Sequence, residues 1–113
     1  MSGLYCQGDL IEADFSSSSG HEPAKRRPAL VVSVDEFNNL ISSLTVVCPI
    51  TSVDTGHTMH IAIPAHNAVG GYICVEQLRA VDLKTRKAES LDGSLDADTM
   101  ALVLETIGAI FGI

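Results

Sequence analysis

The sequence predicts a mainly β fold, a sandwich or small barrel, that ends in one α-helix. Short apolar runs rich in β-branched residues follow one another at near-regular spacing, with glycine- or proline-containing turns between them. From about Asp96 the apolar residues change to the period of about 3.6 residues that is typical of an amphipathic helix. A chain of 113 residues is expected to form a single domain, 1–113.

The first strand is expected at residues 8–15, where apolar and acidic side chains alternate as in a half-buried strand. The polar loop that follows, through Arg26, is long for a hairpin connection. Long ordered loops are often functional, although a simple surface tip is the alternative. A second, central strand is predicted at 28–34. Pro28 stands at its start, where a missing N–H does least harm.

Residues 35–39 predict a turn or a single helical turn, and the next buried strand covers 44–50. Shorter strands follow at 58–63, 72–75 and 79–81. The C-terminal helix should lay one apolar face on the barrel, formed by Met100, Val103, Leu104, Ile107, Ile110 and Phe111. Asp96 and Asp98 suit its first turn, because carboxylates are stabilised at the positive end of the helix dipole.

The net charge of −7 argues at first sight against a nucleic-acid partner, because phosphate binding needs positive surface. The distribution weakens that objection. The cationic side chains fall in two clusters, Lys25-Arg26-Arg27 and Arg79, Lys84, Arg86 and Lys87. If the fold joins the clusters, a positive groove can exist on a negative body, whereas two solvated turns are the simpler alternative.

Cys6, Cys48 and Cys74 are odd in number and far apart, which favours small buried thiols in a reducing compartment over a disulfide framework or a zinc site. No apolar run approaches the roughly 20 residues that span a bilayer, and the N-terminus does not look like a signal peptide. A cytoplasmic protein without a membrane partner is therefore expected.

Arg27 is the cation whose position the fold should fix, because it directly precedes Pro28. A fixed guanidinium can donate two parallel hydrogen bonds to phosphate oxygens and stabilise a pentacoordinate transition state. Thr51 and Ser52 end a buried strand, where their hydroxyls could orient a ribose or a phosphate oxygen. The alternatives are a rim salt bridge for the arginine and a turn cap for the hydroxyls.

Proton transfer has three candidates, namely His21, Glu22 and Glu76. Histidine titrates near neutrality, and a glutamate near basic groups stays an ionised acceptor. A metal is not expected. His57 and His60 stand three residues apart on a predicted strand and should face opposite sides, which disfavours a zinc pair, and His66 has no evident partner.

Several segments occur in a characteristic order: Gly8-Asp9-Leu10-Ile11, Gly20-His21-Glu22, Arg27-Pro28-Ala29-Leu30-Val31-Val32, Cys48-Pro49-Ile50-Thr51-Ser52 and Glu76-Gln77-Leu78-Arg79-Ala80-Val81-Asp82. Together they resemble the MazF/PemK (Kid-like) family of toxin endoribonucleases from type II toxin–antitoxin modules. The likeness covers almost the whole chain, and the ordered set is far more specific than any one motif in it.

The resemblance implies an SH3-like β-barrel with a C-terminal helix that works as a homodimer. The implied activity is cleavage of single-stranded RNA, often mRNA, at short sequences, without a metal or other cofactor. The ribose 2′-OH would attack the adjacent phosphorus and leave a 2′,3′-cyclic phosphate and a 5′-OH. A cognate MazE/PemI-like antitoxin, itself able to bind DNA, would cover the RNA groove.

The family's catalytic pair falls on Arg27 and Thr51, its active-site histidine on His21 and its proposed base on Glu76. Arg27 would hold the phosphorane, Glu76 or Glu22 would take the 2′-OH proton, and His21 would protonate the leaving oxygen. Substrate contacts are expected from Glu22, Lys25, Arg26, Ser52, Gln77 and Arg79.

The chain departs from some relatives, which carry an arginine as the proposed acid where this sequence has Cys74. Two other classes remain open from the sequence. One is a non-catalytic toxin of the CcdB type, which shares the fold and inhibits DNA gyrase, and the other is a binding module that has lost activity. The gyrase inhibitor would not need Arg27 and Thr51 together, so their joint presence favours the nuclease.

Overall fold

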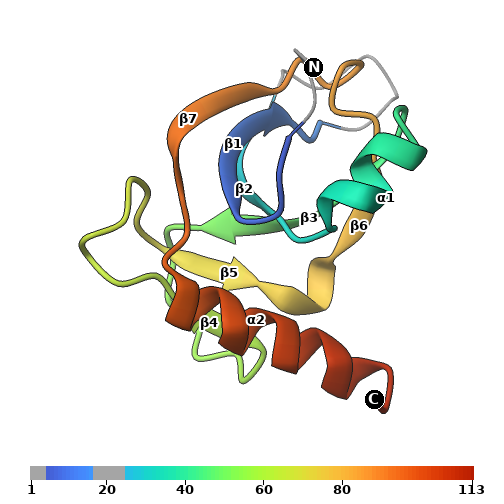
Figure 1. Ribbon diagram of the computed structural model, residues 1–113. Coiled ribbons are helices and arrows are strands. Elements are labelled where there is room, and N and C mark those ends of the chain that lie inside the picture. Colours follow the sequence, from blue (N-terminus) through green and yellow to red (C-terminus); the bar gives the residue numbers. More distant parts are fainter. Residues whose placement is uncertain (1–4, 17–24) are drawn as a thin grey trace.

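The computed structural model describes residues 5–16 and 25–113, so the sequence positions His21 and Glu22 lie outside the described residues. The elements in chain order are β1 (Asp9–Asp14), β2 (Arg26–Val31), α1 (Asp35–Leu40), β3 (Thr45–Thr51), β4 (His60–Ala62), β5 (Tyr72–Cys74), the single 3-10 turn η1 (Val75–Gln77), β6 (Arg79–Val81), β7 (Glu89–Ser94) and α2 (Ala97–Ile110). The predicted mainly β fold with a C-terminal helix is confirmed (Figure 1).

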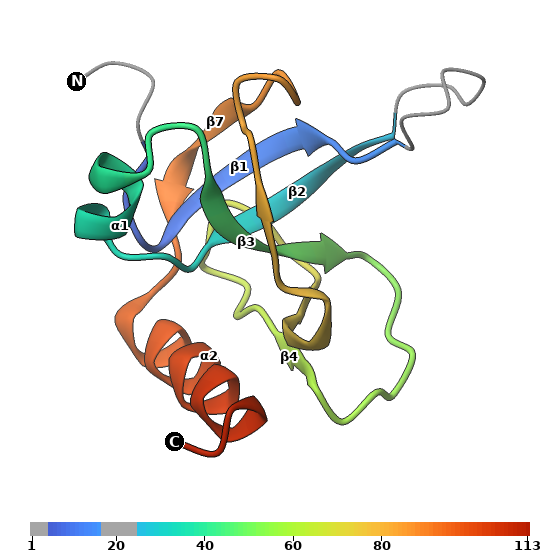
Figure 2. The ribbon, with the colours of Figure 1, turned by 90° about the vertical axis from the view of Figure 1, so that its right-hand side faces the viewer.

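All strand pairs are antiparallel and form one sheet in the order β4-β5-β3-β2-β1-β7, with β6 as a second partner of β3. β2 runs along one edge of β3. On the other edge, Thr45–Val47 pair with β6, whereas Ile50 and Thr51 pair with β5. The sheet curls as in a small barrel, but in the described chain its end strands β4 and β7 do not pair, so the barrel is not closed (Figure 2).

Strand β2 begins two residues earlier than the sequence suggests and stops at Val31. Pro28 therefore lies inside the strand. It is opposite Glu12 of β1, and the ladder to β3 covers only Ala29–Val31, so the missing N–H falls just beyond the end of that ladder. As a consequence, Arg27 belongs to the strand rather than to the loop before it.

Strand β7 was not predicted from the sequence. Its only apolar residue is Leu91, and its register on β1 shifts between Leu10 and Ile11. Asp92 adopts a positive φ of 59°, which interrupts the alternation of side chains. A polar, irregular edge strand of this kind lacks the period-2 pattern by which strands are recognised.

Two apolar clusters fill the two faces of the sheet. One is formed by Leu10, Leu30, Val32, Cys48, Ile50, Ile63, Ile73, Val75, Leu95, Met100 and Val103. The other is formed by Ile11, Ala13, Ala29, Val31, Val47, Val81 and Leu83. Helix α2 covers the first cluster and runs beneath β5 in Figure 1.

The predicted contact face of α2 is only partly correct. Met100, Val103 and Ile107 pack on the core, but Leu104, Ile110 and Phe111 are 38%, 41% and 64% exposed. The sheet is narrow, so a single stripe of the helix reaches it. Leu104 and Ile110 flank that stripe, and Phe111 lies beyond the end of the helix.

The start of α2 is fixed to the loop after β4. Asp96 is the N-cap, as its position in the sequence suggested, and accepts hydrogen bonds from the Thr99 N–H and hydroxyl. Asn67 donates to the other Asp96 carboxylate oxygen and accepts the Asp96 N–H. These hydrogen bonds, the Thr99 N–H first, hold the pKa of Asp96 at about 2.

Neither helix in residues 5–16 and 25–113 is long and apolar enough to cross a membrane.

Gly71 should be indispensable for the junction of β3 and β5. Its φ is +121°, and a Cβ there would lie 2.5 Å from the carbonyl oxygen of Thr51. We expect Gly71→Ala to lower the free energy of unfolding by about 1–3 kcal/mol or more, as measured by urea denaturation. Gly70→Ala is the matched control, because nothing lies within 4 Å of a Cβ there. Equal stabilities of the two variants would contradict this account.

Candidate active site

The register of β2 on β3 carries Arg27 and Thr51 to the same end of this strand pair. The ladder ends where Ala29 lies opposite Pro49, and Arg27 and Thr51 are each two residues beyond that last pair. Because side chains alternate along a strand, both lie on the face to which Ala29 and Pro49 point. The guanidinium and the hydroxyl, 24 positions apart in sequence, therefore lie on one face at one end of the β2–β3 pair.

The same face continues across β5 and β4. Thr51 pairs with Tyr72, and Cys74 pairs with His60. Because side chains alternate along a strand, Thr51, Cys74 and His60 share one face of the sheet, while Ile50 and Ile73 point into the core on the other. Glu76 follows at once in η1, where the chain passes from β5 to β6.

The Thr51 hydroxyl oxygen accepts a hydrogen bond from the Val53 N–H at 3.2 Å. Its own proton remains available for a second partner, since a hydroxyl donates one hydrogen bond as well as accepting. Ser52 is exposed in the bend directly after β3. The capping contact and a substrate contact of Thr51 are thus compatible.

The carboxylate of Glu76 is held by His60. His60 Nε2 lies 2.9 Å from Glu76 Oε2, and Gln77 Nε2 donates to the same oxygen at 3.3 Å. Burial opposes ionisation of Glu76, but these hydrogen bonds outweigh it and lower the pKa of the carboxyl group. The second oxygen, Oε1, is buried and has no hydrogen-bond partner in the described chain.

The expectation that His57 and His60 face opposite sides is wrong. Strand β4 begins only at His60, and the three residues before it form a turn in which the His60 N–H donates to the His57 carbonyl oxygen. The turn stacks the two imidazoles, with ring centroids 4.7 Å apart and an interplanar angle of 16°. The period of a strand therefore does not apply between these residues.

Burial and neighbouring charges shift the pKa of the Cys74 thiol. Burial and the Glu76 carboxylate raise the pKa of the thiol, whereas Arg27 and the Thr51 backbone oppose that rise. The thiol is buried and its pKa is raised, so it stays protonated at neutral pH.

Arg26 and Arg27 of the first cationic cluster are consecutive residues of β2, so their side chains point to opposite faces of the sheet. Arg26 points away from Arg27 and is bound to the Glu12 carboxylate at 3.1 Å and to the carbonyl oxygens of Glu12 and Lys87. Lys25 is exposed at the start of the described segment. Arg27 is also exposed, and within the described chain it forms no ion pair.

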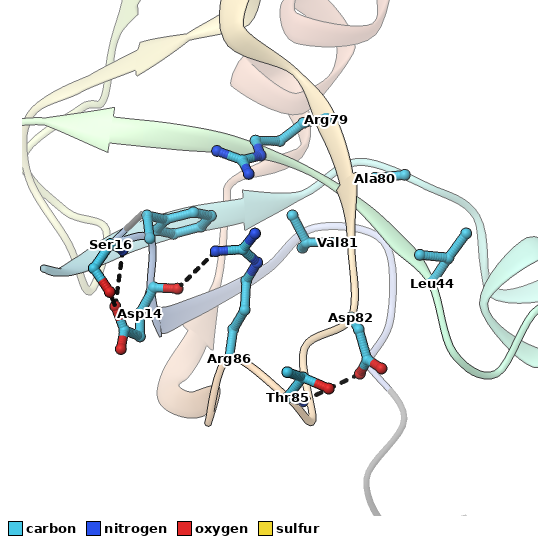
Figure 3. Close-up of a pocket in the computed structure, with 10 residues that line it drawn as sticks. Asp14, Ser16, Leu44, Arg79, Ala80, Val81, Asp82, Thr85 and Arg86 are labelled. Carbon is cyan, nitrogen blue, oxygen red and sulfur yellow. Dashed lines mark hydrogen bonds between the residues drawn. The ribbon is translucent and has the colours of Figure 1, made fainter. Parts of the chain in front are cut away.

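A second cationic feature lies beside the first, in an open pocket of about 860 Å³. It is lined by Asp14, Phe15, Ser16, Leu44, Arg79, Ala80, Val81, Asp82, Thr85 and Arg86. The Arg79 and Arg86 guanidinium carbons lie 5.7 and 5.8 Å from the centroid of the Phe15 ring. Figure 3 shows both arginines projecting into the same space from β6 and from the turn after it.

The two carboxylates of this pocket accept hydrogen bonds from residues two or three positions away in sequence. Asp14 accepts hydrogen bonds from the Ser16 hydroxyl and N–H, which lower its pKa. Asp82 accepts the N–H groups of Lys84 and Thr85, which also lower its pKa. The pocket adjoins Arg27, because Ala13 lies opposite Arg27 and Phe15, just beyond the end of β1, packs on the same face as Ala13.

Sequence reasoning did not assign Phe15 to the site, considered His60 only as a metal ligand, and named Arg86 only as a member of the second cationic cluster. The alternation of Met59, Ile61 and Ile63 with His60 and Ala62 does indicate that His60 points away from the core. It does not reveal that β4 pairs with β5 in the register that directs His60 toward Glu76. A positioned guanidinium, a hydroxyl donor and a carboxylate with one unpaired oxygen can together bind a phosphodiester and accept a proton beside it.

The hydrogen bond from His60 should set the acidity of Glu76. We expect His60→Ala to raise the pKa of Glu76, because burial is then less opposed, and carboxyl ¹³C chemical shifts measured against pH report it directly. In the unaltered chain the folded-state pKa is depressed. The contact therefore stabilises the fold above the unfolded pKa of about 4.3, and that stabilisation is lost as pH falls through the folded pKa. An unchanged midpoint in the variant would exclude this role for His60.

Comparison with known proteins assigns the chain to a family. Residues 6–111 match the family model of the PemK-like, MazF-like toxin of type II toxin–antitoxin systems. The Escherichia coli (strain K12) endoribonuclease toxin ChpB is 36% identical over 95 residues, covering 80% of each chain. The endoribonuclease toxin MazF of the same strain is 26% identical, covering 93% of this chain and 92% of the relative.

The fold agrees with that assignment. A crystal structure of MazE-MazF from Deinococcus radiodurans matches with a TM-score of 0.87 and 34% identity over 97% of both chains. Because the family model spans nearly the whole sequence and a solved relative superposes over its full length, this chain belongs to the PemK-like, MazF-like toxin family.

Proposed function

We propose that the protein is an endoribonuclease toxin of a type II toxin–antitoxin module that cleaves single-stranded RNA, mRNA above all, at short sequences in the cytoplasm. The relatives named endoribonuclease toxins support the activity. The observation that best supports the chemistry is that Arg27 and Thr51 lie on one face at the same end of the β2–β3 pair, and that Glu76, held by His60, follows β5 on the neighbouring edge.

The reaction we propose is transesterification within the substrate. The ribose 2′-OH attacks the adjacent phosphorus, its proton passes to Glu76, and the bond to the 5′-oxygen breaks. The products are a 2′,3′-cyclic phosphate and a 5′-OH. Glu76 can take this proton because its carboxyl group, with its lowered pKa, is ionised at neutral pH, and Oε1 forms no hydrogen bond within the described chain.

Arg27 and Thr51 stabilise the phosphorane in this proposal. A guanidinium is a poor base, since its pKa stays above about 12, but it offsets the extra charge of the transition state. The Thr51 hydroxyl donates to a phosphate oxygen while Val53 holds it in place. His21 remains the proposed acid for the leaving 5′-oxygen, with Glu22 as the alternative base, both outside the described residues.

In this proposal the pocket of Phe15, Arg79 and Arg86 binds the part of the RNA next to the cleaved bond. Arginines beside an aromatic ring suit a phosphate with a neighbouring unstacked base. Lys25, Ser52 and Gln77 flank the proposed site as further substrate contacts. Arg26 makes a weaker contribution, because Glu12 and two carbonyl groups already engage its guanidinium.

A cognate MazE/PemI-like antitoxin is the proposed protein partner. Solved relatives include MazE-MazF complexes. An acidic antitoxin segment could pair with Arg27 and the Arg79–Arg86 pocket, and the complex would bind DNA through the antitoxin. The gyrase-inhibiting alternative is not favoured, because the named relatives are endoribonucleases and such an inhibitor does not require Arg27 beside Thr51.

The proposed assembly is a homodimer in which the exposed apolar side chains at the end of α2 contact a second copy. Leu104, Ile110 and Phe111 lie on or just after that helix, and Ile113 at the C-terminus is 99% exposed. A cluster of this kind on a small chain is typical of an interaction surface.

Incubation of the purified protein with a long RNA in EDTA should yield discrete fragments that end in cyclic phosphate. Arg27→Ala should reduce the cleavage rate by about 10²–10³, with an unchanged circular dichroism spectrum, because one positioned charge donor is lost. Arg26→Ala is the matched control and should lose much less. Absence of cleavage by the parent chain, or full activity of Arg27→Ala, would refute the proposed function or the role of Arg27 respectively.

The dimer proposal predicts that Leu104→Asp combined with Phe111→Asp yields a monomer, because the added carboxylates would be buried against the partner. Light scattering after size-exclusion chromatography measures the mass. Leu40→Asp on α1, at a residue 80% exposed, is the control and should leave the dimer intact. A parent chain that is monomeric, or a double variant that remains dimeric, would rule out this interface.

A further inference from the structure

The stacked imidazoles and the carboxylate beside them form a cluster that the proposed reaction does not fully use. One ligand atom each from His57, His60 and Glu76 lies within 4.8 Å of the other two. The three residues come from the turn before β4, from β4 itself and from η1. The rest of the described chain offers no comparable group of histidine, cysteine and acidic side chains.

The hydrogen bonds leave electron pairs available within this cluster. His57 Nδ1 accepts the Met59 N–H at 3.0 Å, which leaves Nε2 as its other ring nitrogen. His60 Nε2 already faces Glu76 Oε2 at 2.9 Å. Glu76 Oε1 is buried and has no hydrogen-bond partner among the described residues, an arrangement that costs free energy unless another group approaches it.

We propose that His57, His60 and Glu76 bind a divalent transition-metal ion of the zinc class. Two imidazole nitrogens and one carboxylate oxygen are a common three-ligand set for such ions, with a fourth position left to water or another donor. An ion about 2.0–2.2 Å from each ligand would hold the ligand atoms roughly 3.4 Å apart. The His60–Glu76 pair, now 2.9 Å apart, would have to open slightly, and the wider separations, of up to 4.8 Å, would have to close. Residues 52–58 are all exposed, so His57 can move toward His60 and Glu76.

The bound metal would act as an inhibitor of RNA cleavage. The metal would bind the carboxylate of Glu76, the group that takes the 2′-OH proton in the proposed reaction. Glu76 cannot accept that proton while its carboxylate binds the metal. This consequence rests on the proposed function, whereas binding of the metal does not. The site would thus make toxin activity sensitive to free zinc.

The test is a titration of the full chain, free of any affinity tag, with Co²⁺ in place of zinc, followed by visible absorption. We expect one Co²⁺ per chain, with the intense bands of a low-coordinate site, and their loss when Zn²⁺ is added. His57→Asn retains an acceptor near Nδ1 for the Met59 N–H but removes Nε2. We expect it to weaken metal binding by more than about tenfold.

His66→Asn is the matched control. His66 also lies near a carboxylate, with Nε2 3.8 Å from Asp96 Oδ1, but it lies outside the cluster and should bind Co²⁺ like the parent chain. A parent spectrum equal to that of Co²⁺ in buffer, or unchanged binding by His57→Asn, would overturn the proposal. So would equal losses in the two variants.

An RNA cleavage assay with added Zn²⁺ separates the two proposals. Inhibition of the parent chain at a zinc concentration that spares His57→Asn supports the inhibitory site. If the parent binds Co²⁺ but cleaves no RNA, the metal site stands and the proposed function fails. If zinc inhibits both proteins equally, the inhibitory role of this cluster is refuted.

Discussion

The site depends on the point at which β3 changes partners. Its edge away from β2 pairs with β6 up to Val47 and with β5 from Ile50 onward. Pro49 lies between these ladders and has no N–H to donate, so the interruption leaves no backbone donor unpaired at that position. The chain between β5 and β6 must bridge this gap, and it does so as η1, which carries Glu76. This bridge therefore places Glu76 beside β3, which itself continues past the break and ends at Thr51.

The sequence could predict those parts of the fold that local patterns determine. The β-branched runs that became β2 and β3, and the helical period of α2 with its Asp96 cap, are visible one segment at a time. β7 is not, because its irregular, polar strand is stabilised by pairing with β1 rather than by a pattern of its own.

The candidate site shows the same division. Arg27, Thr51 and Glu76 could be proposed because each stands at the end of a recognisable apolar run or in a family motif. His60 could not be proposed, because its contact with Glu76 depends on the register of β4 on β5. The two residues are 16 positions apart in sequence, so no local pattern reveals that they meet. The stacking of His57 on His60 likewise depends on a turn that begins β4 later than its apolar pattern suggested.

Charge acts locally on this molecule. The chain is acidic overall, yet Glu12 neutralises Arg26 on one side of β2 while Arg27 stays exposed on the other. Arg79 and Arg86 both lie beside the Phe15 ring, so a cationic strip coexists with a net charge of −7. A polyanion would be repelled by most of the surface and held only along this strip. Both RNA affinity and antitoxin affinity should therefore depend strongly on salt.

The unpaired oxygen of Glu76 connects catalysis and inhibition. A buried carboxylate oxygen without a partner costs on the order of 1–3 kcal/mol, and a hydrogen-bond donor, a proton or a cation that reaches it relieves that cost. His60 holds the group through the other oxygen, which leaves Oε1 without a partner. In the two proposals, a proton from a ribose and a metal ion held with His57 would compete for the electron pairs of this carboxylate. A glutamate placed to act as the proposed base is therefore also placed to bind the proposed metal.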